Sequence, residues 1–449
     1  MPDQIADNKL GTMPCGKLLA SMSVPMMISF FIQAMYNIID SMFVAMISEN
    51  ALTAVSLAFP MQQIVNAVGV GVGTGINALI PRYTGQGNRE KASRVANSGI
   101  FLNAVFFLFF LILGIVFPGS FYRTQTDVPE IVQGGTTYLT IVLCLSAGML
   151  YGQYFEKMLV ASGYARQAML CQAAGAIFNI VFDPLLIFGL GPFPKMGIAG
   201  AAVATVAGQI LASVLAMTIN LKVNRTVDFS VSKMRPSPEC GEILKTGLPS
   251  MITIGLNSAS TFFVNQILLV YSTTATALYG IWAKLQNFCY MPVFGMNNGM
   301  IPILSFNHGQ NKLDRVKETT QLAFRWVLIF TLIEMVVLEC LPGSVLRLFS
   351  ASETMLGMGV PAMRIICISL PLGALSIIAS ASMQALRHPN YTLILNILRQ
   401  FVVIVGCFAL LNLAFHRLTI VWFAVPVTEA ICIIIALFLY RRTMANLEA

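Results

Sequence analysis

The feature that most constrains this chain is an internal repeat. Residues 25–86 align without a gap on residues 249–310, a shift of 224 positions. The matched positions are mostly Pro, Gly and Gln, and they include Pro25 with Pro249, Gln62 with Gln286 and Gly75 with Gly299. A repeat of about 220 residues in a very apolar chain indicates two copies of a membrane unit, an architecture typical of secondary transporters.

The composition excludes an ordinary soluble domain. Hydrophobic residues make up 57% of the chain and charged residues only 10%, whereas a soluble domain carries about 25% charged residues. Crossing about 30 Å of hydrocarbon takes a helix of about 20 apolar residues. We therefore predict an all-α polytopic membrane protein with twelve transmembrane helices, at residues 18–47, 51–80, 95–117, 131–156, 167–190, 197–221, 247–271, 275–304, 322–341, 356–384, 391–413 and 419–440.

The repeat divides these helices into two lobes of six. We predict an N-lobe over residues 1–221, a polar and basic linker over 222–246, and a C-lobe over 247–449. An even number of helices in each half means that both halves enter the membrane in the same direction. Their pseudo-two-fold axis is therefore expected along the membrane normal.

The charge distribution predicts the orientation. Most of the 27 Lys and Arg residues lie in the N-terminus, in every second loop and in the C-terminus, whereas the opposite loops hold only Arg123, Lys195, Arg347 and Arg417. By the positive-inside rule both termini face the cytoplasm. The first apolar stretch is too long for a signal peptide and follows a polar lead. The basic residues do not form the patch that a nucleic-acid partner requires, so we expect none.

Motif analysis argues against an enzyme. No phosphate-binding G-x-x-x-x-G-K-[ST] string is present, so transport has to be driven by an ion gradient or by a partner. No nucleophile–base set is apparent, and the nine cysteines are scattered singly, without the spacing of a disulfide framework or a zinc site. We expect no cofactor other than a coupling ion, and a monomer in the bilayer.

Polar residues inside the apolar spans mark the candidate site, because ionisable groups at membrane depth are costly and usually functional. Gln33, Tyr36, Asn37 and Asp40 share one face of the first span by their spacing of three, four and seven residues. The fifth span adds Gln172, Asn179 and Asp183, and the sixth adds Thr205 and Gln209. For Asp40 and Asp183 we favour function; for Gln172, Gln209 or Thr205 alone we favour hydrogen bonding between helices.

Two carboxyls in one pocket suggest a coupling mechanism. A carboxyl in low-dielectric surroundings near a second acid favours its neutral form, so it can bind a proton on one side of the membrane and release it on the other. The oxygens of Asp40, Asn179, Asp183 and Thr205 also suit sodium. The sequence leaves proton and sodium open as the coupling ion.

The second half carries different polar residues. Val264 stands at the repeat position of Asp40, whereas Asn257, Lys284 and Met291 are candidates for the substrate pocket. Flexible thioethers and aromatic faces suit apolar cations of varied shape. For Lys284 a structural salt bridge is an equal alternative, and for Met291 ordinary packing remains open.

The sequence resembles the multidrug and toxic compound extrusion (MATE) family, in the branch of MepA-type and DinF-type proteins. The resemblance covers essentially the whole chain and is most specific in residues 24–47 (VPMMISFFIQAMYNIIDSMFVAMI), 52–75 and 179–189 (NIVFDPLLIFG). It implies an exporter of cationic drugs and dyes across the bacterial cytoplasmic membrane, driven by protons or sodium. It also implies that Asp40 is the coupling acid, that Asp183, Asn179 and Thr205 surround it, and that the first helix bends near Pro25.

Two alternatives remain open. A flippase for lipid-linked precursors belongs to the same superfamily, but it is expected to line its cavity with basic residues that hold pyrophosphate. An antiporter of another metabolite would share the same architecture. A major-facilitator transporter would carry an Asp-Arg pair after the second span, which residues 82–94 lack.

Overall fold

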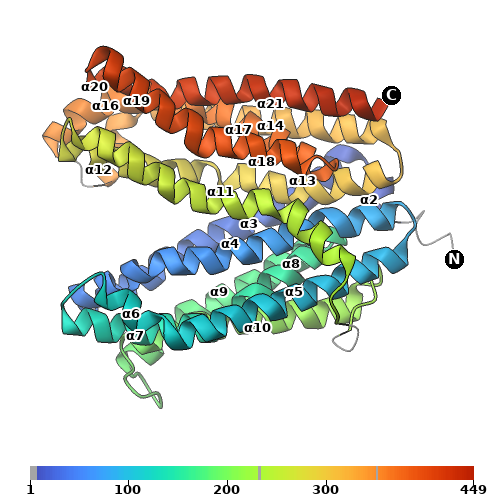
Figure 1. Cartoon of the computed structure of the whole chain (residues 1–449), viewed down its shortest axis with the longest axis horizontal. Coiled ribbons are helices and arrows are strands. Elements are labelled where there is room, and N and C mark those ends of the chain that lie inside the picture. Colours follow the sequence, from blue (N-terminus) through green and yellow to red (C-terminus); the bar gives the residue numbers. More distant parts are fainter. Residues whose placement is uncertain (1–7, 231–233, 350–351, 449) are drawn as a thin grey trace. The chain divides into compact units, whose positions relative to one another are not determined.

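The computed structural model describes residues 8–230, 234–349 and 352–448, and their secondary structure is helical (Figure 1). In the first half the helices are α2 (Lys9–Thr12), α3 (Cys15–Ala45), α4 (Glu49–Gly85), α5 (Arg89–Val116), α6 (Pro118–Arg123), α7 (Pro129–Cys144), α8 (Ala147–Ala161), α9 (Ala165–Phe188) and α10 (Ile198–Val223). In the second half they are α11 (Pro238–Leu269), α12 (Thr273–Cys289), α13 (Met291–Gly309), α14 (Leu313–Cys340), α15 (Pro342–Leu348), α16 (Glu353–Cys367), α17 (Ser369–Ala385), α18 (Pro389–Ile397), η2 (Leu398–Val402), α19 (Val403–Phe415), α20 (Leu418–Val421) and α21 (Ala424–Glu448).

Ten helical stretches of the described residues are long and apolar enough to cross a membrane, and the bent pair α7–α8 raises the number to eleven. The predicted eighth span is divided into α12 and α13, with a break at Tyr290. The predicted fourth span is also not one straight helix, because α7 and α8 meet at an angle of 42°. Large apolar side chains on many helices are exposed, as lipid-facing side chains are, for example Ile115, Val116, Leu410 and Leu413.

The repeat reappears as matching helix boundaries. Ser48 caps α4 and Ser272 caps α12, and each hydroxyl accepts a 3.0 Å hydrogen bond from the backbone N–H three residues later. Pro118 and Pro342, again 224 positions apart, begin α6 and α15, where the fixed φ of proline suits the first helical position. The same residue type therefore starts the equivalent helix in both halves.

The chain forms two compact units whose boundaries differ from the predicted ones. Unit 1 consists of Met1–Thr12 and Ile28–Met251, and unit 2 of Met13–Met27 and Ile252–Ala449. Both α3 and α11 therefore begin in one unit and end in the other. Each changes unit two residues after a proline, Pro25 in α3 and Pro249 in α11.

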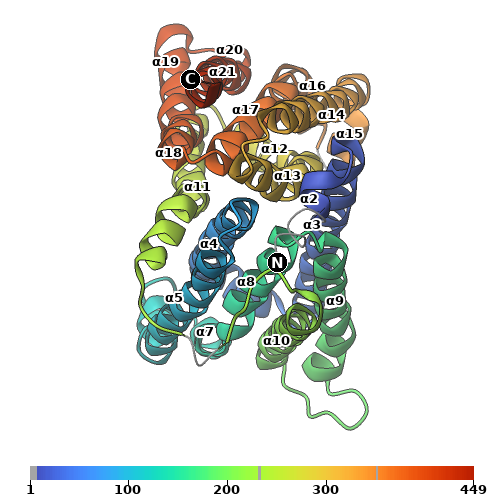
Figure 2. The same cartoon turned by 90° about the vertical axis from the view of Figure 1, so that its right-hand side faces the viewer.

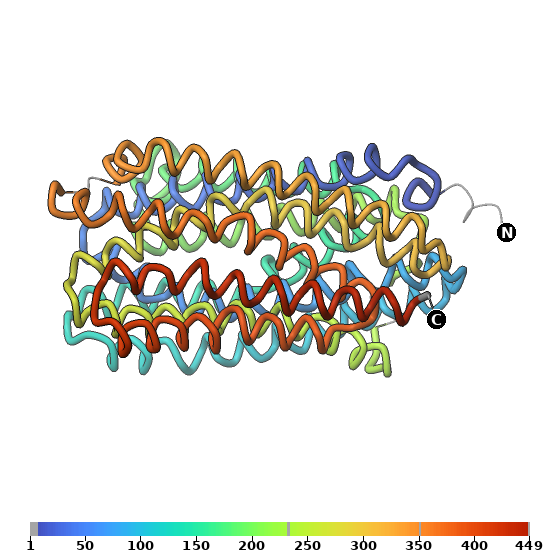
Figure 3. Tube along the Cα trace, turned by 90° about the horizontal axis from the view of Figure 1, so that it is seen from above, coloured from blue at the N-terminus to red at the C-terminus, as the bar shows by residue number. Residues whose placement is uncertain are grey.

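Each unit is built around one central helix. In unit 1, α8 packs against α4 and α10 and lies between them in the end-on view of Figure 2. In unit 2, α17, at the repeat position of α8, packs against α13, α14 and α21. Figure 3 shows α19 and α21 (both red) lying lengthwise side by side, with opposite chain directions.

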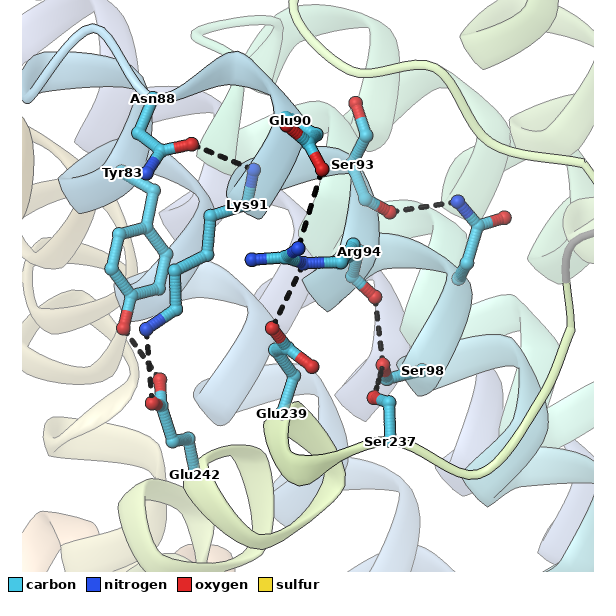
Figure 4. A network of polar contacts seen from close by, with 11 residues as sticks. Tyr83, Asn88, Glu90, Lys91, Ser93, Arg94, Ser98, Ser237, Glu239 and Glu242 are labelled. Carbon is cyan, nitrogen blue, oxygen red and sulfur yellow. Dashed lines mark hydrogen bonds and ion pairs between the residues drawn. The ribbon is translucent and has the colours of Figure 1, made fainter.

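The linker between the halves is fastened to α4 and α5 by a polar network (Figure 4). Glu239 forms a 3.0 Å ion pair with Arg94, and Glu242 accepts hydrogen bonds from Tyr83 and Lys91. All these residues belong to unit 1. The network therefore fixes the first turns of α11 to unit 1, whereas the later turns of α11 belong to unit 2.

Candidate functional site

Three helices of unit 1 bring a cluster of polar side chains together. Asp183 and Asn179 lie one turn apart on α9, and both are buried. In the orientation of the Asn179 amide that pairs both of its polar atoms, the nitrogen donates to Asp183 Oδ2 at 3.2 Å. The oxygen then accepts from the Thr205 backbone N–H on α10 at 3.2 Å. The polar residues of the fifth and sixth predicted spans thus meet in space.

Side-chain and electrostatic interactions link the Asp40 carboxyl, on α3, to the Asp183 carboxyl. Two ionised carboxylates that interact in this way repel each other, and a shared proton or a bound cation would relieve the repulsion. Asp40 Oδ1 is buried and has no hydrogen-bond partner among the residues that the structure describes. Asp40, Asn179, Asp183 and Thr205 therefore form one oxygen-rich cluster, and their role in ion coupling stays a prediction.

Two tyrosines extend the cluster. Electrostatic interactions link Tyr36 on α3 and Tyr138 on α7 to both Asp40 and Asp183. The Tyr138 hydroxyl also accepts a 2.8 Å hydrogen bond from Gln62 Nε2 on α4. Tyr138 was not predicted, because a single tyrosine in an apolar span is ordinary packing until its neighbours on other helices are known.

A cavity of about 120 Å³ opens beside the cluster, among α3, α8, α9 and α10. Gln33 and Tyr36 line it from α3, and Gln172 donates to Gln33 Oε1 at 3.2 Å across it. Gln209, Asn179 and Thr205 are further lining residues.

Small residues give the cavity its shape. A Cβ on Gly175 would lie 2.6 Å from the Gly208 carbonyl oxygen, so α9 and α10 approach closely because both positions are glycine.

The structure places the remaining candidates elsewhere. Asn37 is exposed and does not line the cavity, because it lies at the edge of the polar face centred on Gln33, Tyr36 and Asp40. Asn257 and Lys284 are exposed in unit 2, and the half-buried Met291 begins α13. Pro25 lies inside α3, in the part that belongs to unit 2. None of these described residues lines the unit 1 cavity.

The sequence analysis did not identify two cavity residues on α8, Gln153 and Glu156. Gln153 and Glu156 line the cavity together with Gly148, Met149 and Gly152, a spacing that places all five on one helical face. The rule that singled out Asp40, a charged residue within an apolar span, also applies to Glu156. Glu156 is the last residue of the predicted span 131–156 and was not among the predicted candidates.

The comparisons with known proteins follow the same two halves. The sequence profile of the MatE family matches residues 25–185 and 249–409, two stretches that are again 224 positions apart. The FAD transporter of Shewanella oneidensis is 24% identical over 444 residues, which cover 97% of this chain and 96% of that protein. The multidrug export protein MepA of Staphylococcus haemolyticus is 24% identical over 425 residues, covering 94% of this chain and 92% of that protein.

A solved structure supports the fold. It is described as the outward-facing conformation of a multidrug resistance MATE family transporter of the MOP superfamily. It superposes with a TM-score of 0.91 over 98% of both chains, at 24% identity. The prediction of an all-α membrane fold is thereby confirmed. The chain belongs to the MatE (MATE) family and is a multi-pass secondary transporter.

Proposed function

We propose that this protein exports amphipathic organic cations by antiport against a coupling cation, with alternating access. The observation that carries the proposal is the interaction between the carboxyls of the half-buried Asp40 and the buried Asp183, beside a cavity. One positive charge, from a shared proton or a bound cation, would offset the repulsion between the two carboxylates. The relatedness to MepA supports a drug-like substrate.

The proposed coupling follows from the chemistry of the pair. When a proton bridges Asp40 and Asp183, their repulsion is removed and the helices α3 and α9 can stay together. When the proton leaves, the two like charges destabilise this arrangement and favour one in which α3 has moved. The two states of the pair thereby bias two arrangements of the helices, which is what an antiporter requires.

Sodium is the alternative coupling ion. The carboxylate oxygens of Asp40 and Asp183 and the side-chain oxygens of Asn179 and Thr205 are the hard ligands that such a cation prefers. The same four residues would hold either ion, so the ion has to be identified by experiment.

The cavity is the proposed binding site for the substrate in unit 1. Gln33, Tyr36, Gln172 and Gln209 offer amide and hydroxyl groups within an otherwise apolar lining, a combination typical of small-molecule sites. Asn257, Lys284 and Met291 remain the proposed contribution of unit 2. Pro25 is the proposed hinge of α3, because a proline inside a helix removes a backbone hydrogen bond and makes bending easier.

Export of a phosphate-bearing metabolite is the second candidate, and the relatedness to the FAD transporter of Shewanella oneidensis favours it. A flippase for pyrophosphate-linked lipids would need similar recognition of anions. Basic residues are absent from the described lining of the unit 1 cavity, which supports the cation proposal. We further propose a monomer in the bacterial cytoplasmic membrane with both termini in the cytoplasm.

The test is efflux of ethidium from proteoliposomes under an imposed pH gradient, with and without sodium. We expect the wild type to export the dye and Asp40→Asn to lose gradient-driven export, because an amide cannot exchange a proton. Asp127→Asn is the matched control, since it makes the same chemical change on an exposed loop. Full export by Asp40→Asn would refute the coupling role, and the absence of ethidium export by the wild type would favour the metabolite candidate.

A further inference from the structure

The cavity in unit 1 carries a single formal charge among its described lining residues, and that charge is Glu156. We propose that Glu156 is the residue that selects cationic over anionic substrates, acting as a recognition site separate from the ion-coupling cluster. The inference rests on the proposed function and names the residue that distinguishes a positively charged substrate from a negatively charged one.

Glu156 and the coupling cluster lie at different heights along the cavity. Glu156 interacts electrostatically with Cys171, near the start of α9, whereas Asp183 lies twelve residues further along that helix. Twelve residues of α-helix span about 18 Å. A substrate held at Glu156 therefore leaves Asp40 and Asp183 accessible to their own ion.

The partner of Glu156 lies outside the cavity lining. Lys157 Nζ is 3.2 Å from Glu156 Oε1, and both side chains are largely buried. Neighbouring residues on a helix point about 100° apart, and Lys157 packs toward α4, where a Cβ on Gly73 would lie 2.8 Å from Lys157 Cγ. The cavity is thus lined by the carboxylate and not by the ammonium group.

The surroundings of Glu156 suit an organic cation. The nearby lining groups on α8 and α9 are Gln153, Gln172, Met149 and Cys171, which are neutral and include two polarizable sulfur atoms. None of the polar contacts among the described residues engages Glu156 Oε2. A carboxylate oxygen in such a setting attracts a cation and repels a phosphate or a carboxylate, and the neighbouring Lys157 charge reduces the size of both effects.

The experiment compares two ions of nearly identical size and opposite charge, tetraphenylphosphonium and tetraphenylborate. Their dissociation constants are measured by equilibrium dialysis against the purified full-length protein. We expect Glu156→Gln to weaken tetraphenylphosphonium binding by about tenfold to a hundredfold, the usual effect of removing a charged partner. Tetraphenylborate binding should not weaken. The matched control is Glu90→Gln, an exposed acid outside the cavity, which should bind both ions as the wild type does.

Glu156→Gln leaves Lys157 buried without its partner, which can destabilise the fold. The double variant Glu156→Gln/Lys157→Met removes both charges and should show the same loss of cation binding, whereas Lys157→Met alone should retain it. Wild-type affinity for tetraphenylphosphonium in the double variant would overturn the inference, as would an equal loss in Lys157→Met alone. Failure of the proposed function would give a different result. In that case the wild type itself would neither bind tetraphenylphosphonium nor export ethidium, and both proposals would fall.

Discussion

Asn179 is the residue that connects the Asp183 carboxyl to the neighbouring helix α10. Its amide donates to Asp183 Oδ2 and accepts from the Thr205 backbone N–H, so it joins α9 to α10 at the depth of the cluster. An amide is suited to this position because it offers one donor and one acceptor without adding a charge. The geometry of the coupling pair therefore depends on a neutral side chain as well as on the two acids.

Replacing Asn179 tests this dependence. Asn179→Ala removes a hydrogen bond to a charged or shared carboxyl, which is worth about 1.5–3 kcal/mol. We expect the rate of ethidium export under a fixed pH gradient to fall by about tenfold or more. Asn287→Ala is the matched control, because Asn287 is exposed and bonds only to its own helix among the described contacts. Export at the wild-type rate by Asn179→Ala would contradict this role.

The packing of whole elements decides whether the cavity exists. The helices α9 and α10 are in close contact at Gly175 and Gly208, and a Cβ on either glycine would come within 2.7 Å of the other's carbonyl oxygen. The side chains that line the cavity on both sides of this contact are held in place by it. A small increase in volume there has to push the two helices apart.

We expect Gly175→Ala to destabilise the protein by about 1–3 kcal/mol, the typical cost of overpacking. Gly406→Ala is the matched control, because Gly406 lies inside α19 with no atom within 4 Å of its added Cβ. That control should be neutral or stabilise by about 0.5–1 kcal/mol through helix propensity. Thermal unfolding of the purified variants measures both effects, and equal melting temperatures for the two variants would count against close packing at Gly175.

A second element-scale feature lies in unit 2. The π-helical turn η2 carries Arg399, whose Nε donates to Glu429 Oε2 on α21 at 2.7 Å and to Oε1 at 2.9 Å. The Tyr290 ring, at the break between α12 and α13, lies 5.9 Å from the guanidinium carbon of Arg399. Short π-helical turns interrupt α-helices frequently at functional sites, and here the turn coincides with a buried ion pair.

Removing one partner of this pair should be costly. We expect Arg399→Gln to destabilise the protein by about 3–5 kcal/mol, because Glu429 is left as an uncompensated buried charge. The double variant Arg399→Met/Glu429→Leu should recover most of that loss, since an apolar pair avoids the desolvation of two charges. Equal instability of the single and double variants in thermal unfolding would show that packing, and not the charge, dominates.

At the scale of the whole molecule, two helices belong to both units. The helix α3 starts in unit 2 and continues in unit 1, whereas α11 starts in unit 1 and continues in unit 2. The linker network around Glu239 and Glu242 ties the start of α11 to α4 and α5 (Figure 4). Because Pro25 and Pro249 precede the two crossings at equivalent repeat positions, each helix has a site of weakened backbone hydrogen bonding where it changes unit.

We expect Pro25→Ala to lower the turnover of ethidium export several-fold while leaving tetraphenylphosphonium binding unchanged, because the stiffer helix bends less readily. Pro249→Ala, in the equivalent position, shows whether the second crossing bends as well. Pro361→Ala is the control, since Pro361 lies inside α16, which stays within unit 2. Unchanged turnover in Pro25→Ala would rule out the hinge.

The sequence by itself determined the features that depend on a single segment of chain. The duplication and the apolar spans follow from local patterns, because the length of an apolar run is a property of one helix. The cost of ionisable groups at membrane depth also singled out Asp40 and Asp183 without knowledge of their neighbours.

The tertiary structure decided which further side chains join the predicted ones. The sequence placed Asp40 and Asp183 in one pocket, but the interaction of Tyr138 with both depends on how α3, α7 and α9 are rotated against each other, and the periodicity of one helix does not contain that rotation. For the same reason only the fold decides that Glu156, and not the adjacent Lys157, lines the cavity. The break at Tyr290 and the pairing of Arg399 with Glu429 likewise arise from packing between helices, which no single segment of the chain specifies.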